Sequence, residues 1–185
     1  MPRYPYPHTI DNGGGEVLTF HRRVPGATGD RLEGENRVAP GAGPPMHVHH
    51  RQEEGLTVLE GRLAWQRPGE PPRFAGPGES VVFRAGEAHR FWNAGEGELR
   101  CAAYIEPAGN VEYFLAELFA SQRRLGRGRP DPFDAAFLTH RYRSQFAMVA
   151  IPAPVRRFVV PLLAALGRLL GRQARYADAP APLRG

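Results

Sequence analysis

Four residues have the types and the spacing of a metal site. One glycine-bounded segment carries His47, His49 and Glu54, and a second carries His89. Three imidazoles and one carboxylate are a common ligand set for a divalent transition metal. Because His47 and His49 are two residues apart, their side chains would point to the same face of a β-strand. We therefore predict that the chain binds one divalent metal ion.

The residues directly next to these ligand candidates in the sequence are expected on the opposite face of each strand. Glu54 would share its strand face with Leu56 and Val58, whereas Glu53 would point the opposite way as a solvated carboxylate. His50 is likewise expected to point away from the site. The alternation therefore separates the ligand candidates from the residues beside them.

A substrate pocket is predicted from the same alternation. Leu56, Val58 and Phe91 would share the inward face with the ligands. Such a lining is apolar, which suits a small organic molecule better than a sugar phosphate. The alternation leaves open the orientation of three further aromatic residues, Trp65, Phe74 and Trp92.

The remaining histidines and the one cysteine lie outside this pattern. Ordinary surface roles are expected for His8, His21 and His140. Cys101 is the only cysteine in the sequence, so an intramolecular disulfide is excluded. We expect Cys101 to be a small core residue rather than a nucleophile, because no partner motif surrounds it.

Both segments resemble the two signature motifs of the cupin superfamily of small β-barrels. The first motif is present at every defining position, namely Gly41, His47, His49, Glu54 and Gly61. The second is present at Gly78, Gly86, His89 and Asn93, with Arg84 where the family usually has proline. The resemblance covers residues 36–107. It implies that His47, His49, Glu54 and His89 are the metal ligands.

The resemblance also implies a fold and a function. The fold would be mainly β, a double-stranded β-helix or jelly-roll barrel, in the single-barrel (monocupin) form because the sequence has no internal repeat. Cupins with this ligand set are often dioxygenases, as in the quercetin dioxygenase-like group. The ligand set suits Fe, Mn, Ni or Zn and does not separate them.

The charge of such a site indicates the kind of molecule it would bind. A dication beside one carboxylate leaves a net positive charge, which favours an anionic or chelating small organic molecule. We therefore hypothesise a metal-dependent dioxygenase. Two alternatives stay open: a non-redox metal enzyme such as an isomerase, decarboxylase or lyase, and a non-catalytic sensor that binds a small molecule or metal.

The organisation of the chain changes after residue 109. Residues 1–15 are rich in turn formers and are predicted to form an N-terminal arm. Residues 16–109 have the short alternating segments and Gly/Pro turns of a β-barrel. Residues 110–175 have helical patterns and are predicted to form a C-terminal helical extension, followed by a flexible tail over 176–185.

Helix boundaries in the extension are predicted from capping residues. Asn110 is expected to cap the first helix, and Asp131 followed by Pro132 is a strong start for the second. The apolar segment 158–170 contains Pro161, so we expect a kink or a new helix start there.

The charge of the chain is divided unevenly. Residues 1–120 hold 12 Arg and 16 acidic residues, whereas residues 121–185 hold 12 Arg and three acidic residues. We expect the extension to cap the barrel and to contribute to a homodimer. The alternative is peripheral contact of residues 155–175 with an anionic membrane surface. Nucleic-acid binding is not expected, because the basic residues lack interleaved aromatic stacking motifs.

The N-terminal residues bear on localisation. Met1 and the residues after it lack the apolar core of a signal peptide, so a cytoplasmic protein is expected.

Overall fold

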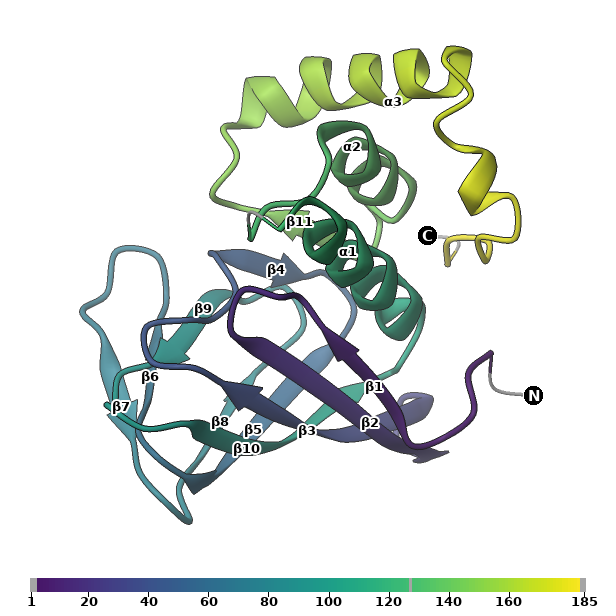
Figure 1. The fold of residues 1–185 in the computed structure, drawn as a ribbon. Coiled ribbons are helices and arrows are strands. Elements are labelled where there is room, and N and C mark those ends of the chain that lie inside the picture. Colours follow the sequence, from purple (N-terminus) through teal and green to yellow (C-terminus); the bar gives the residue numbers. More distant parts are fainter. Residues whose placement is uncertain (1–2, 127, 184–185) are drawn as a thin grey trace.

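Two antiparallel β-sheets form the larger part of the molecule, here called the β domain (Figure 1). The computed structural model describes residues 3–126 and 128–183. The first sheet has the order β1 (His8–Asp11), β2 (Glu16–Pro25), β3 (Asp30–Val38), β10 (Leu99–Glu106), β5 (Glu53–Glu60) and β8 (Ser80–Phe83). The second has the order β11 (Phe146–Met148), β4 (His47–His49), β9 (Ala88–Asn93), β6 (Leu63–Gln66) and β7 (Arg73–Ala75).

Strand β9 illustrates how the sequence specifies these sheets. His89, Phe91 and Asn93 are buried, and the intervening Arg90 is exposed while Trp92 is half-buried. This is the period of two that places alternate side chains on opposite faces of a sheet. The polar residues His89 and Asn93 therefore lie on the interior face beside Phe91.

The C-terminal helices are stacked in layers on the β domain. Helix α1 (Val111–Leu125) packs on β1, α2 (Pro132–Arg141) packs on α1, and α3 (Val160–Leu169) packs on α2 as the outermost layer (Figure 1). A π-helical turn, Val155–Val159, leads directly into α3, and a short 3-10 helix, Ala174–Tyr176, follows it. None of the helices in the described residues is long and apolar enough to cross a membrane.

Two separate hydrophobic cores hold these layers together. The first lies in the β domain and comprises Val38, Leu56, Val58, Leu63, Trp65, Ala75, Val81, Phe83, Phe91, Leu99 and Cys101. The second joins the β domain to the helices and comprises Ile10, Phe20, Leu32, Ala108, Val111, Tyr113, Phe114, Phe119, Leu138, Tyr142, Phe146 and Tyr176. The helical extension is therefore part of the folded core.

The helix ends agree with two of the three capping predictions. The Asp131 side chain accepts hydrogen bonds from the backbone N–H groups of Phe133 and Asp134, with Pro132 in the first turn. Helix α3 starts at Val160, directly after the π-helical turn Val155–Val159, so Pro161 lies where the regular α-helical hydrogen-bond pattern is interrupted.

The prediction for Asn110 was wrong. Its side chain makes no capping hydrogen bond to α1. The Asn110 side-chain amide donates to the backbone oxygen of Ala181 instead. The side chain therefore fixes the C-terminal segment rather than the start of the helix.

The structure confirms a mainly β fold with C-terminal helices, and it differs from the predicted boundaries at three places. Strand β1 lies inside the predicted N-terminal arm and pairs with β2. Strand β11 lies inside the predicted helical extension and pairs with β4. The predicted tail, as far as residue 183, is held by hydrogen bonds, since Arg141 and Tyr142 donate to the backbone oxygen of Pro180. Closure of the two sheets into a barrel stays a prediction.

Candidate metal centre

Four side chains from three strands converge in the interior of the β domain. His47 and His49 come from β4, Glu54 from β5 and His89 from β9. His47 and His89 are directly opposite each other in the β4–β9 register. The Nε2 atoms of His47, His49 and His89 lie 3.8, 3.2 and 3.1 Å from the same Glu54 oxygen, Oε2. One candidate ligand atom from each residue lies within 4.8 Å of all the others.

These separations fit a shared metal ion. Metal–nitrogen and metal–oxygen bonds of about 2.1 Å place neighbouring ligand atoms at 90° about 3.0 Å apart. The three distances to Glu54 Oε2, which are 3.1, 3.2 and 3.8 Å, lie at or slightly above this separation. The cluster therefore has the size of a first coordination shell.

Hydrogen bonds to backbone oxygens fix which imidazole nitrogen of His47 and His89 faces the cluster. The Nδ1 atom of His47 lies 2.9 Å from the backbone oxygen of Pro45. The Nδ1 atom of His89 lies 3.0 Å from the backbone oxygen of Glu87. Since a carbonyl oxygen only accepts, each Nδ1 is the protonated donor and each Nε2 keeps its lone pair for a metal.

Aromatic packing holds two of the rings in place. The His89 ring stacks on Phe83, with ring centroids 3.8 Å apart and an interplanar angle of 1°. The His49 ring meets Phe146 of β11 edge-on, with centroids 5.4 Å apart. Phe146 is also the register partner of His49 across the β11–β4 pair. The helical extension thus supports a candidate ligand directly.

The charge states of the cluster suit metal binding. Burial would raise the pKa of Glu54, but the neighbouring imidazoles of His47, His49 and His89 hold that pKa well below its ordinary value. Burial lowers the pKa of His49, and the neighbouring Glu54 offsets this only in part. Glu54 is therefore ionised and His49 neutral near neutral pH, and these are the forms that ligate a metal.

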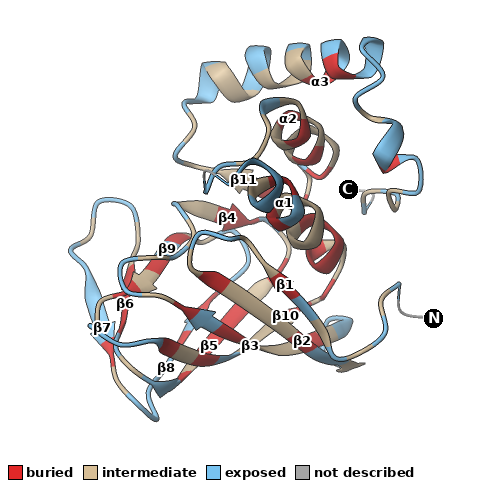
Figure 2. Cartoon of the chain, in the orientation of Figure 1, coloured by how far each residue is buried: buried red, intermediate tan, exposed pale blue. Residues whose placement is uncertain are grey.

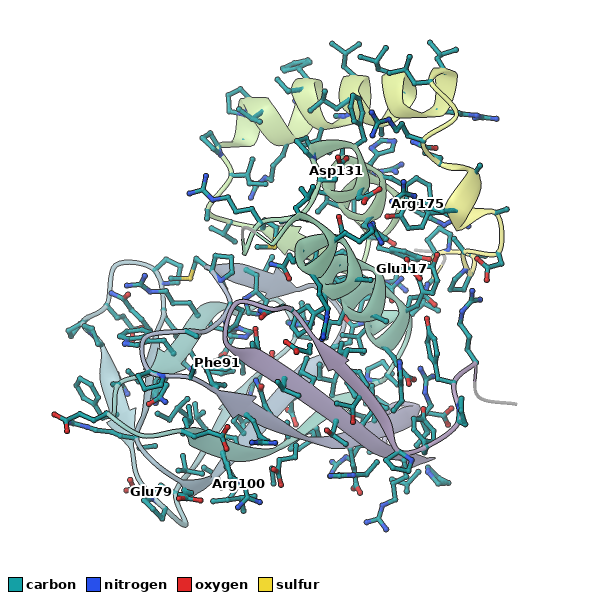
Figure 3. The ribbon with its side chains drawn as sticks, in the orientation of Figure 1. Glu79, Phe91, Arg100, Glu117, Asp131 and Arg175 are labelled. Carbon is teal, nitrogen blue, oxygen red and sulfur yellow. The ribbon has the colours of Figure 1, made fainter. Side chains whose placement is uncertain are left out.

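A cavity of about 730 Å³ leads from this cluster to the helices. Its wall near the cluster includes Leu56 and Phe91, two of the three residues predicted to line the pocket. Figure 3 labels Phe91 among the strands, below the helices. Val58 is buried in the β-domain core and is not part of this wall. That Leu56, Val58 and Phe91 contact a substrate stays a prediction.

The far wall of the cavity is built by the helical extension. Its apolar side chains include Phe114 and Leu118 of α1, Phe146 and Met148 of β11, and Leu163 of α3. The sequence pattern missed this wall because β11 has only three residues, too few for a period of two to be recognised. The uninterrupted apolar run from Phe146 to Ile151 was the available signal.

Two buried polar residues in the cavity wall were also missed. Glu16 of β2 is 6% exposed and Asn36 of β3 is 2% exposed. The Asn36 side-chain amide donates to Glu16 Oε1 at 3.1 Å. Burial raises the pKa of Glu16 to about 7. Glu16 and Asn36 could have been recognised in the sequence as polar residues at positions where the strand alternation predicts an inward-facing side chain.

The other residues discussed from the sequence lie away from the cluster. Glu53 accepts a hydrogen bond from the Tyr104 hydroxyl at 2.7 Å, and His50 is exposed. Cys101 is buried in the core, and burial raises the pKa of its thiol to about 12. His21 is exposed and His140 is half-buried.

The prediction of an ordinary surface role for His8 was wrong. The Nδ1 atom of His8 lies 3.0 Å from the carboxylate of Glu112, a buried residue of α1. The same carboxylate accepts hydrogen bonds from Tyr6 and Arg23. His8 therefore helps to join β1 to α1.

Comparison with known families identifies the central part of the chain. Residues 34–105, less than half of the chain, match the family model described as a cupin domain. The resemblance to the cupin superfamily is thereby confirmed over these residues, whereas the quercetin dioxygenase-like subgroup stays a prediction. No curated protein sequence matches the chain.

Solved structures with a similar fold include an uncharacterized conserved protein with a double-stranded beta-helix domain from Klebsiella pneumoniae. That match has 17% identity and a TM-score of 0.45, and it covers 51% of this chain and 78% of that chain. KdgF from Halomonas sp. matches with 19% identity and a TM-score of 0.45, covering 53% and 86% of the two chains. The polyketide cyclase RemF from Streptomyces resistomycificus matches with 22% identity and a TM-score of 0.45, covering 57% and 78%.

Proposed function

We propose that this protein is a divalent-metal-dependent enzyme that acts on a small, mainly apolar organic molecule with an anionic or chelating group. The observation that carries the proposal is a buried cluster of three histidines and one glutamate facing a largely apolar cavity of about 730 Å³. Cavities of roughly 300–1,000 Å³ are typical of sites for small organic ligands.

The charge of the cluster favours a chelating group. Four protein ligands leave one or two coordination positions of a five- or six-coordinate metal for another molecule. A divalent ion bound there would polarise a ketone or enol oxygen of that molecule and lower its pKa. Glu54 supplies one negative charge, so an additional anionic oxygen would still be attracted.

The chain itself supplies orientation and exclusion of water. The backbone oxygens of Pro45 and Glu87 fix the rings of His47 and His89, so the open positions face a constant direction. The apolar side chains of α1 and β11 would displace water around the body of the bound molecule. These features suit a reaction in which a bound enol or enolate must be protected from solvent.

We place the reaction in the dioxygenase class, with a non-redox isomerase, decarboxylase or lyase as the second candidate. The paired residues Glu16 and Asn36 favour the second candidate, because a buried carboxyl beside a metal cluster can transfer protons without a change in oxidation state.

The test compares protein loaded with Fe(II) and protein loaded with Zn(II). Each form is incubated with a panel of ortho-hydroxy ketones and β-diketones, and both oxygen consumption and substrate loss are recorded. A dioxygenase consumes oxygen in the Fe(II) form and not in the Zn(II) form. Turnover by the zinc form without oxygen consumption would assign the non-redox class. Binding without turnover by either form would contradict the enzyme proposal and favour a sensor. The exposed neighbour variant His50→Ala is the control and should behave as wild type.

A further inference from the structure

The pair Glu16–Asn36 is an unusual feature of the cavity wall. The two residues lie diagonally across the β2–β3 pair, since Glu16 is opposite Val38 and Leu18 is opposite Asn36. They share this face with the apolar residues Leu18 and Phe20, which also line the cavity. Buried polar groups are costly unless they are fully hydrogen-bonded, so a purely structural pair would be expected to satisfy its members.

The pair is not fully satisfied. One hydrogen bond joins the Asn36 amide to Glu16 Oε1. The side-chain oxygen of Asn36, Oδ1, is buried and has no hydrogen-bond partner among residues 3–126 and 128–183. An acceptor without a donor from the protein, in the wall of a cavity, is free to accept a hydrogen bond from a molecule that occupies the cavity.

The electrostatic surroundings connect this pair to the metal cluster. Glu16 lines the same cavity as His47, His49 and Glu54 of the cluster, and the charges of Glu54 and His47 act on its carboxyl group. Burial raises the pKa of Glu16 to about 7, so its carboxyl can accept or donate a hydrogen bond near neutral pH. The wall therefore presents two acceptors and one exchangeable proton beside the metal site.

We propose that Glu16 and Asn36 form a second polar subsite, which binds a hydroxyl group of the same molecule that the metal cluster binds. The inference rests on the proposed function and adds a substrate class to it: a chelating organic molecule that carries at least one further hydroxyl. Asn36 Oδ1 accepts the hydroxyl hydrogen, and Glu16 fixes the Asn36 amide so that Oδ1 faces the cavity.

The test uses allomaltol and kojic acid, two hydroxypyranones with the same chelating group that differ by one hydroxyl. Their dissociation constants are measured by calorimetry on zinc-loaded protein. One additional hydrogen bond to a buried polar group corresponds to roughly tenfold tighter binding of kojic acid. Asn36→Leu should remove this preference, so that kojic acid and allomaltol bind with equal dissociation constants. The matched control Glu53→Gln alters a carboxyl that is bonded to Tyr104 and is not part of the cavity wall, so it should preserve the preference.

A second measurement does not depend on the metal. Phenol is added to a His47→Ala/His89→Ala variant, and the Asn36 side-chain amide signal is followed by NMR. A saturable shift supports the subsite even if the proposed function fails. The proposal is overturned if kojic acid binds wild type no more tightly than allomaltol and phenol does not change the chemical shift of the Asn36 side-chain amide. An unchanged kojic acid preference in Asn36→Leu would also overturn it.

A separate observation concerns the outer face of the last helix. Phe158, Leu162 and Leu169 are 66%, 68% and 84% exposed, and Leu166 and Leu170 are also exposed. The spacing of three and four residues places these side chains on one face of the helix. Figure 2 shows that this outward side of α3 is largely exposed, while its inner side faces α2.

The charges around this face all have one sign. Between Asp134 and Asp178 the sequence contains seven Arg and no acidic residue. Arg157, Arg168 and Arg172 belong to this set and are exposed. An apolar helix face flanked by arginines fits an interface with anionic headgroups, where the side chains enter the acyl boundary. The ten residues of α3 are too few to span a bilayer, which takes about 20.

We infer that this face, residues Phe158, Leu162, Leu166, Leu169 and Leu170, docks on an anionic membrane surface. The wild type is sedimented with vesicles of phosphatidylcholine alone or of equal parts phosphatidylcholine and phosphatidylglycerol. Binding is expected only to the anionic vesicles and should weaken as salt is added. Leu162→Ser/Leu169→Ser should abolish it, whereas Leu59→Ser/Phe74→Ser, which alters exposed residues of the β domain, should not.

Three results would overturn this assignment. The first is equal binding to neutral vesicles, and the second is undiminished binding of Leu162→Ser/Leu169→Ser. The third is a dimer in light scattering that dissociates in the same variant, which would assign the face to a second copy of the chain.

Discussion

The two ends of the cavity are built in different ways. The metal end consists of polar groups from β4, β5 and β9, whose orientation is fixed by backbone carbonyls and by a stacked phenylalanine. The helical end consists of apolar side chains from α1, α2, β11 and α3, with no ligand motif. In the proposed function, the strands would therefore supply the metal ligands, while the helical extension would limit the shape of the molecule that binds.

The largest expected effect comes from the residue that joins the two ends. Phe146 is buried, contacts the His49 ring and packs on Phe114 with centroids 4.9 Å apart. Phe146→Ala should reduce the free energy of unfolding by about 3–5 kcal/mol and weaken metal retention. Urea denaturation measures the first effect. Phe158→Ala, at an exposed position, should change stability by less than about 0.5 kcal/mol. Equal losses of unfolding free energy in Phe146→Ala and Phe158→Ala would contradict the conclusion that Phe146 joins the two ends of the cavity.

A second test concerns the charge of Glu16 in metal-free protein. Its pKa is raised to about 7 from an ordinary value of 4.5, so the folded state binds more protons than the unfolded state between these values. Stability should therefore fall as the pH rises from about 5 to 8, by up to about 3 kcal/mol from this group. Glu16→Gln should remove that slope. A pH profile unchanged by the substitution would show that Glu16 is not buried as described.

The backbone of the metal end gives a third comparison, between two glycines. A Cβ on Gly43 would lie 2.2 Å from the backbone oxygen of Phe91 on β9, and its φ is +148°. A Cβ on the motif glycine Gly41, with φ +74°, would meet nothing within 4 Å. Gly43→Ala should cost about 2 kcal/mol or more because the backbone itself must move. Gly41→Ala should cost about 1 kcal/mol, from its backbone conformation alone. Thermal unfolding of both variants checks the order.

The smallest effect is expected at the helical end. Asp131 caps α2 and lies among the helices in Figure 3. Asp131→Ala should cost about 1 kcal/mol, the usual value of a helix N-cap. Asn110→Ala should cost less, because Asn110 makes no capping bond. Urea denaturation measures both variants. A lower midpoint for Asn110→Ala than for Asp131→Ala would contradict this prediction.

The sequence predicted the metal end better than the helical end for a physical reason. The ligands His47, His49 and His89 follow a local period of two and a fixed motif spacing, so they could be found without the fold. The contact of Phe146 with His49 joins residues almost one hundred positions apart through a three-residue strand. Local periodicity carries no information on such a pair.

Two kinds of prediction could not be made from local pattern at all. Val58 has the strand alternation of a pocket residue, but its side chain is covered by the β-domain core. Glu16 has the residue type of a surface position, and the alternation of β2 alone does not show that its inward face lies in a cavity wall removed from water. Homodimer formation and a cytoplasmic location stay predictions.

The most direct test of the account is the metal content of purified protein. Elemental analysis should find about one equivalent of a divalent transition metal per chain in wild type and in His50→Ala, as expected for a single cluster of four ligands. In His47→Ala/His89→Ala it should find almost none, while circular dichroism should show a folded protein, because the hydrophobic cores are unchanged. Stoichiometric metal in the double variant would contradict the assignment of His47, His49, Glu54 and His89 as its ligands.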